Sequence, residues 1–122
     1  MPDTALLTTL LDSLKAPFLF ADTGHVIRYM NKAAVAHYKE GPALLGRSLL
    51  DCHNADSQRQ IVEILAVLRA GEEERLITDN EKHRIFMRAV RGAAGQLLGY
   101  YERYEPPCRP GAVGAMARSQ PP

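Results

Sequence analysis

The segment at residues 51–57 (DCHNADS) gathers the side chains of this sequence that are best suited to chemistry. Cys52 and His53 are a nucleophile and a base by type, and both residue types also bind metals. A catalytic Cys/His pair must face each other within hydrogen-bond reach, which adjacency in the sequence does not provide. The chain also has no Gly-rich phosphate loop, zinc-ligand spacing or nucleophile elbow. We therefore expect a binding protein and not an enzyme.

A second set of functional side chains lies at residues 83–91, where the sequence alternates with a period of two. Ile85 and Met87 share one face of the strand that this period predicts. Arg84 and Arg88 share the opposite face, where we expect them to be exposed to solvent.

The size and composition of the chain fit one small globular domain. It has 122 residues, of which 46% are hydrophobic and 24% charged. The net charge of +1 gives no reason to expect nucleic acid or an acidic membrane surface as a partner. The two cysteines, Cys52 and Cys108, form no disulfide framework, and the N-terminus has no secretory signal pattern. No apolar run approaches the roughly 20 residues of a membrane span, so we expect a cytoplasmic protein.

The elements that must position these residues follow from the hydrophobic periodicity. Helical spacing predicts helices at 4–15, 32–38 and 57–70, with a brief helical turn at 43–50. Strand patterns occur at 18–21, 26–30, 75–78, 83–91 and 97–104. Asn31 is placed to cap the second helix, and Asn54 or Asp56 the third. Gly24 and Gly95 lie in turns where we expect a positive φ.

This order predicts an α+β fold, in which a five-stranded antiparallel sheet carries helices on one face. Residues 1–16 form an N-terminal flanking helix in this prediction, and residues 17–105 form the domain itself. Residues 106–122 are rich in Pro, Gly and Ala without a period, so we expect a disordered tail.

Three motifs in this order resemble the PAS family of sensory domains. Residues 22–31 (DTGHVIRYMN) are similar to the family's Asp-x-x-Gly-x-Ile…Asn pattern. Residues 44–49 (LLGRSL) resemble the element that precedes its long helix, and residues 91–100 resemble its last hairpin. The resemblance covers about residues 7–105.

The resemblance implies a module that senses a small molecule, redox state or partner and signals through partner proteins. PAS domains commonly form homodimers through an N-terminal helix, and Leu7, Leu11 and Leu14 lie along one face that such a dimer could bury. The helix could instead pack across its own sheet. The alternative function is a PAS domain with a filled core that binds no ligand and acts through dimerisation alone.

The resemblance also implies a ligand pocket between the inner face of the sheet and the helices. The residues expected to line it are Phe20, Ile27, Tyr29, Leu65, Ile85 and Met87. His53 precedes the long helix at a position that faces the pocket in several PAS proteins, including haem-containing gas sensors. It could therefore bind haem iron, with Met87, His83 or Cys52 as a second ligand. The competing role for His53 is structural or that of a polar pocket residue. The surroundings of Cys52 do not resemble the motif of the flavin-binding branch.

Overall fold

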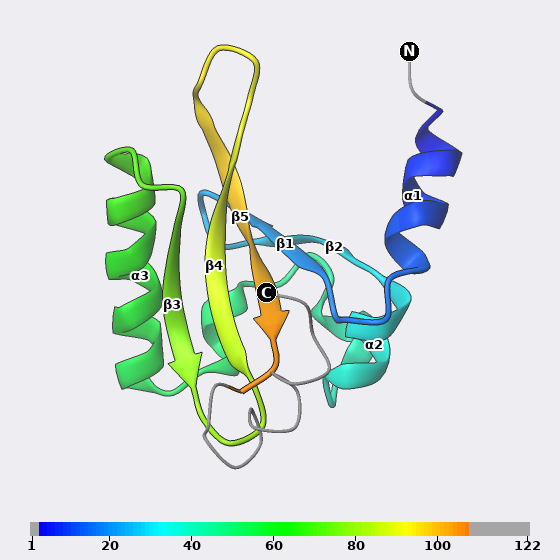
Figure 1. The fold of residues 1–122 in the computed structure, drawn as a ribbon, viewed down its shortest axis with the longest axis horizontal. Helices are drawn as coiled ribbons and strands as arrows, with labels where there is room; N and C mark the ends of the chain where they lie inside the picture. The colour runs from blue at the N-terminus through cyan, green and yellow to red at the C-terminus, as the bar shows by residue number, and fades with distance from the viewer. Residues whose placement is uncertain (1–2, 108–122) are drawn as a thin grey trace, which may run out of the picture.

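A five-stranded antiparallel sheet organises the fold, as the sequence predicts (Figure 1). The computed structural model describes residues 3–107, except for the side chain of Cys52, so most of the expected tail at 106–122 lies outside the described residues. The strands follow the order β2-β1-β5-β4-β3 across the sheet. Their bounds are Leu19–Asp22 for β1, Ile27–Met30 for β2, Glu74–Asp79 for β3, Arg84–Arg91 for β4 and Leu97–Glu105 for β5. The first and last strands of the chain therefore lie side by side at the centre.

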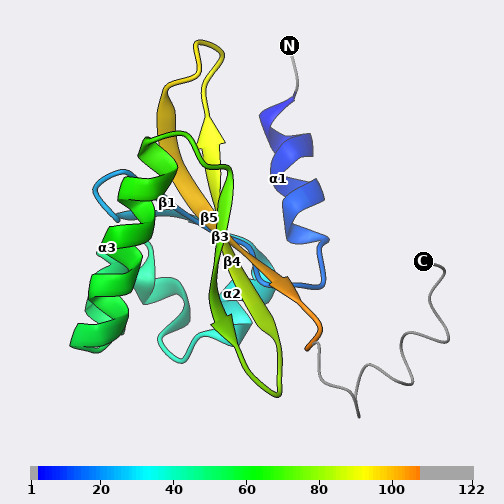
Figure 2. The same cartoon turned by 60° about the vertical axis from the view of Figure 1, so that its left-hand side comes forward.

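The helices divide between the two sides of this sheet (Figures 1 and 2). The helices and short 3-10 turns are α1 (Thr4–Asp12), α2 (Lys32–His37), η1 (Gly41–Leu44), η2 (Leu49–Cys52) and α3 (Ala55–Arg69). The longest helix, α3, runs along one face beside β3 and β4, whereas α1 stands on the other side. We call the face that α3 covers the inner face. None of the helices in the described part of the chain is long and apolar enough to cross a membrane.

The helix starts confirm the cap expected at Asn31 and, of the two candidates for the third helix, select Asn54, so that α3 begins two residues earlier than predicted. The side chain of Asn31 accepts a hydrogen bond from the backbone N–H of Ala34, and Asn54 does the same for Ser57. The apolar stripe of α3 is buried against the sheet and includes Ile61, Ile64, Leu65 and Leu68. Sequence-local capping and periodicity thus explain why α3 begins where it does and which face it buries.

Strand register decides which side chains of β4 and β5 reach the inner face. Met87 lies opposite Glu102, and Ile85 lies opposite Tyr104. All four side chains point to the inner face of the sheet. Met87 and Tyr100 are fully buried there. Arg84 and Arg88 lie on the outer face, as predicted, where they pair with the carboxylates of Glu105 and Glu74.

The turn between β1 and β2 departs from the prediction at Gly24. The positive φ in this turn belongs to His25, at 67°, and Gly24 has no such angle. His25 is held there because its backbone N–H donates to the carbonyl of Asp22 and its Nδ1 lies 2.9 Å from the Tyr100 hydroxyl. Gly95 does adopt a positive φ, of 86°.

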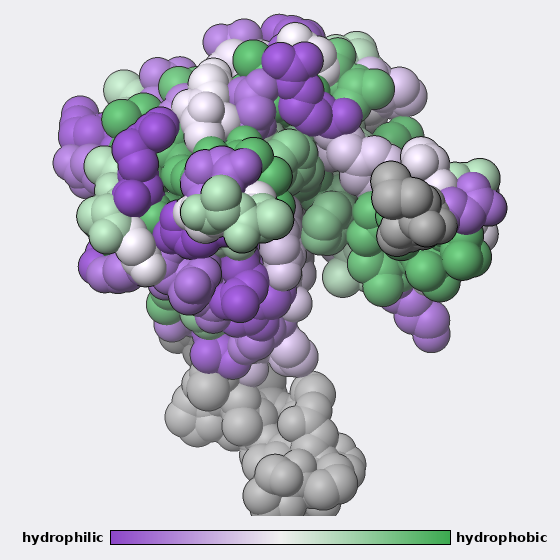
Figure 3. All heavy atoms as spheres, turned by 90° about the horizontal axis from the view of Figure 1, so that it is seen from above, coloured by the Kyte–Doolittle hydropathy of each residue, from purple (hydrophilic) through white to green (hydrophobic). Residues whose placement is uncertain are grey.

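Helix α1 projects from the body of the domain and is attached through polar contacts. The buried side chain of Asn31 donates to the carbonyl of Leu11 at 2.9 Å, and the Tyr29 hydroxyl donates to the Asp12 carboxylate at 2.8 Å. No residue of α1 is buried. Figure 3 shows hydrophobic residues gathered on this projecting part of the molecule. The exposed leucines at this end of the chain are Leu6, Leu7, Leu10 and Leu14.

Candidate functional site

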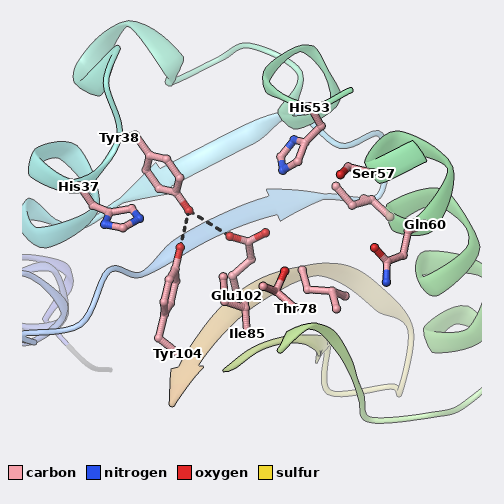
Figure 4. A pocket seen from close by; sticks show the side chains of 11 residues that line it. His37, Tyr38, His53, Ser57, Gln60, Thr78, Ile85, Glu102 and Tyr104 are labelled. Carbon is pink, nitrogen blue, oxygen red and sulfur yellow. Dashed lines mark hydrogen bonds between the residues drawn. The ribbon is translucent and has the colours of Figure 1, made fainter. Parts of the chain in front are cut away.

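A pocket of about 200 Å³ opens between the inner face of the sheet and the helices α2 and α3 (Figure 4). Its polar lining residues are His37, Tyr38, His53, Ser57, Gln60, Thr78, Glu102 and Tyr104. Its apolar lining residues are Ile61, Ile77 and Ile85. Segments far apart in the sequence therefore supply one half-open site with both polar and apolar walls.

Glu102 lies at the inner end of this pocket, on the central strand β5. The residue is only 5% exposed. The Tyr38 hydroxyl donates to its Oε1 at 3.0 Å, and the Tyr104 hydroxyl lies 2.8 Å from that of Tyr38. The Tyr38 hydroxyl has one proton, which it donates to Glu102. The Tyr104 hydroxyl must therefore donate to the Tyr38 oxygen. A chain of three polar groups thus fixes one oxygen of the carboxyl.

Burial raises the pKa of the Glu102 carboxyl above its usual range, because the charged form loses its hydration. The hydrogen bond from Tyr38 and the nearby imidazoles of His53 and His37 act in the opposite direction. Burial likewise raises the pKa of Tyr104 to about 12. No lysine or arginine is among the residues that line the pocket. The pocket therefore holds one carboxyl group without a lysine or arginine beside it.

His53 enters the pocket from the opposite side to Tyr104, directly before the Asn54 cap of α3. Its Nδ1 lies 2.9 Å from the carbonyl oxygen of Leu49, which can only accept. The proton must therefore sit on Nδ1, which leaves Nε2 as an acceptor or a ligand atom. Figure 4 shows the ring turned toward the middle of the pocket.

The structure brings two of the expected site residues together and places the others elsewhere. His53 and Ile85 both line the pocket. Ile27, Leu65 and Met87 belong to the buried hydrophobic core and are not among the lining residues. The side chain of Met87 is fully buried in the hydrophobic core on the inner face of the sheet.

Phe20 and Tyr29 lie on the outer face of the sheet, away from the pocket. They are cross-strand partners, and the residues that flank Phe20 in β1, Leu19 and Ala21, are the buried ones. Since side chains alternate along a strand, burial of Leu19 and Ala21 turns Phe20 outward. Tyr29 instead reaches Asp12 at the end of α1.

The sequence patterns did not identify Glu102, Tyr38 or His37 as site residues. One signal was available, because Tyr100, Glu102 and Tyr104 alternate along a strand and must share a face. A glutamate between two tyrosines on an inward face is unusual, since buried carboxyls are rare unless they are paired. No comparable signal placed His37 or Tyr38 beside them.

The residues present do not fit haem as the pocket is built. About 200 Å³ is below the range of roughly 300–1,000 Å³ that is usual for drug-sized ligands. Met87, the expected second ligand, does not line the pocket, and neither does His83. Among the described residues, no group of three or more His, Cys, Asp or Glu side chains is placed to share a metal ion.

Comparisons with known proteins agree with the fold. A domain from Streptococcus mutans, described as a C-terminal domain, has a similar structure with a TM-score of 0.72 and 20% identity, over 92% of this chain and 90% of that one. The PAS domain of Bordetella pertussis BvgS is similar with a TM-score of 0.62 and 15% identity, over 94% and 93% of the two chains.

A third similar structure is that of VqmA bound to DPO, from the regulator that a related structure assigns to Vibrio cholerae. Its TM-score is 0.63 at 14% identity, and the match covers 91% of this chain and 61% of that one. Comparison with curated protein sequences gives no significant match. A family model described as the PAS domain matches residues 7–104. With this match over most of its length and with the fold described above, the chain belongs to the PAS domain family.

Proposed function

We propose that this chain is a sensory module that binds a small molecule in the pocket around Glu102 and His53 and signals to a protein partner. The observation that carries the proposal is the polar lining of the pocket. Its Glu102 carboxyl has one oxygen held by Tyr38, and its His53 ring offers an acceptor nitrogen. A few polar groups that converge in a concave site with apolar walls are typical of ligand pockets. The ligand-bound VqmA structure supports the same use of this fold.

The alternative, a ligand-free interaction domain, requires a filled core at this place. A pocket of about 200 Å³ with eight polar lining residues does not resemble such a core. PAS domains are typically sensory and not catalytic, so we propose ligand binding without turnover.

A route for the signal is offered by β5, which has the pocket on one face and the base of α1 on the other. Glu102 faces the pocket, and its neighbour Tyr101 faces outward. The ring of Tyr101 lies 4.7 Å from that of Phe18, in the segment that joins α1 to β1. We propose that a change at Glu102 shifts β5 and thereby the Phe18 segment and α1.

We further propose that the partner contacted through α1 is a second copy of this chain. Leu7 and Leu10 lie one turn apart on α1, Leu14 follows the end of the helix, and all three are 46–52% exposed. Exposed leucines in a row are costly in water, and a symmetric helix pair buries them on both copies at once.

The ligand proposal is tested by screening a library of small polar molecules with ¹⁵N-labelled protein and recording amide chemical shifts. We expect saturable shifts that map to α3, β4 and β5 around the pocket. Replacing Ser57 by Phe fills the pocket and should abolish these shifts. Val62→Phe, on the exposed side of the same helix, is the matched control and should retain them. A library without any pocket-specific shift would favour the ligand-free alternative.

A further inference from the structure

Glu102 differs from the other carboxylates of this sheet in its ionic surroundings. Three of the others have an arginine partner: Glu74 with Arg103 at 2.8 Å, Glu105 with Arg84 at 2.6 Å, and Asp22 with Arg28 at 2.7 Å. The fourth, Asp79 at the end of β3, is exposed to solvent. Within the described residues, Glu102 takes part in no ion pair, although it is the most deeply buried of the five. Burying a carboxyl group without a countercharge is costly, so its position requires an explanation.

The groups that face Glu102 are polar, but none of them is a lysine or an arginine. Tyr38 and His37 approach from α2, His53 from the segment before α3, and Tyr104 from the same strand. On β4, the residue opposite Glu102 is the apolar Met87. Tyr38 donates to Oε1, and Figure 4 shows the second oxygen turned into the pocket.

We propose that the pocket binds a small organic ammonium ion, with its charged nitrogen at the second oxygen of Glu102 and its short apolar part against Ile61, Ile77 and Ile85. This inference rests on the proposed function and names the chemical class of the ligand. The ammonium group supplies the countercharge that the protein does not provide. A hydrogen bond between charged partners is also stronger than one between neutral groups.

Two tyrosine rings, those of Tyr38 and Tyr104, lie beside the carboxyl and favour a cation in addition. The ring of His37 is 4.9 Å from that of Tyr38 and 5.6 Å from that of Tyr104, as measured between centroids. Clustered aromatic rings attract organic cations through their negative faces. The acceptor Nε2 of His53 and the hydroxyls of Ser57 and Thr78 can take the remaining ammonium protons.

The same lining disfavours other ligand classes. An anionic ligand would approach a carboxyl with no lysine or arginine to offset the repulsion. A neutral molecule of the same shape would lack the charge-assisted hydrogen bond. Ammonium binding should also weaken as the pH falls through the raised pKa of Glu102, because the carboxyl then gains a proton and loses the charge that holds the ammonium ion.

The experiment titrates the full chain with isobutylammonium, isobutanol and isobutyrate, which share a carbon skeleton and differ in charge. Amide shifts around the pocket report binding. We expect a saturable response to the ammonium probe alone. Glu102→Gln keeps the shape and can still accept from Tyr38, and we expect it to weaken ammonium binding about tenfold or more. Glu63→Gln, at an exposed position of α3, should bind as the wild type does.

Two results would overturn the inference and leave the proposed function standing. One is a stronger pocket response to isobutanol or isobutyrate, and the other is ammonium binding that Glu102→Gln does not reduce. The absence of any response to the ammonium probe also overturns the ammonium assignment. The library screen with Ser57→Phe separately decides whether the pocket binds another class of ligand.

Discussion

The hydroxyl of Tyr38 donates a hydrogen bond to the buried carboxyl of Glu102, with 3.0 Å between the oxygens, and so links the end of α2 to the central strand β5. The Tyr104 hydroxyl, 2.8 Å from that of Tyr38, extends the link along the same strand. Burial raises the pKa of Tyr38 well above its ordinary value, so its hydroxyl keeps the proton that it donates. The pocket therefore has one end that is fixed by hydrogen bonds and lies next to the strand that we propose carries the signal.

Glu102→Gln should stabilise the folded protein near neutral pH. The folded-state pKa of Glu102 is raised above its unfolded value, so the folded protein binds the extra proton between the two values. The free energy of unfolding of the wild type therefore falls as the pH rises between the unfolded and the folded pKa of Glu102, by about 1.4 kcal/mol per pH unit. The glutamine variant lacks this loss. Urea unfolding at about pH 5 and about pH 7.5 measures the difference between wild type and variant. Glu63→Gln serves as the control, and an equal pH response in all three proteins would contradict the prediction.

His53→Ala tests both roles considered for this histidine. We expect haemin titration of the wild type, followed by absorbance in the ferric, ferrous and carbon-monoxide forms, to give no stoichiometric Soret band, because the pocket is small and Met87 lies outside it. His53→Ala should instead weaken ligand-induced shifts in the pocket through loss of the Nε2 acceptor. His83→Ala, outside the pocket, is the matched control. A saturable Soret band that His53→Ala alone removes would establish the haem hypothesis instead.

His25→Gly should give a more stable protein than His25→Ala. Both variants lose the contact between Nδ1 and the Tyr100 hydroxyl, at 2.9 Å. Only alanine keeps a Cβ at the positive φ of 67°, which costs about 1–2 kcal/mol. The difference in the free energy of unfolding between the two variants, measured by chemical denaturation, gives this cost of the backbone conformation. Equal stabilities would show that the turn relaxes to another conformation.

Replacing Leu7 and Leu10 of α1 by Lys should convert the proposed homodimer to a monomer. Both side chains are about half exposed, so the fold of the domain should not change, as circular dichroism can check. Light scattering after size-exclusion chromatography gives the mass of each species. Thr9→Lys places the same charge on another exposed position of the helix and should remain dimeric. A monomeric wild type at high concentration would rule out the homodimer.

The sequence determined the local elements, because their causes are local. Asn31 and Asn54 cap helices at the predicted positions, and the spacing of Ile61, Ile64 and Leu65 identifies the buried face of α3. The alternation in β4 correctly separates Met87 from Arg88. These features depend on chain geometry within a few residues, so a single sequence is sufficient to predict them.

The tertiary structure alone decided which faces turn inward and which side chains meet. Phe20 has the largest side chain of β1, yet Leu19 and Ala21 are the residues buried in the core and Phe20 lies on the outer face. Residue size within one strand does not reveal which neighbour will cover it.

The role of Asn31 extends in the same way beyond its predicted cap. Its side chain also accepts from the Phe18 N–H and donates to the carbonyls of Leu11 and Ala16, and it thereby holds the segment after α1 to the domain. The pocket likewise exists only because α2 brings Tyr38 to Glu102, 64 residues away in the chain. Contacts at such separations depend on the packing of whole elements, which local sequence patterns do not encode.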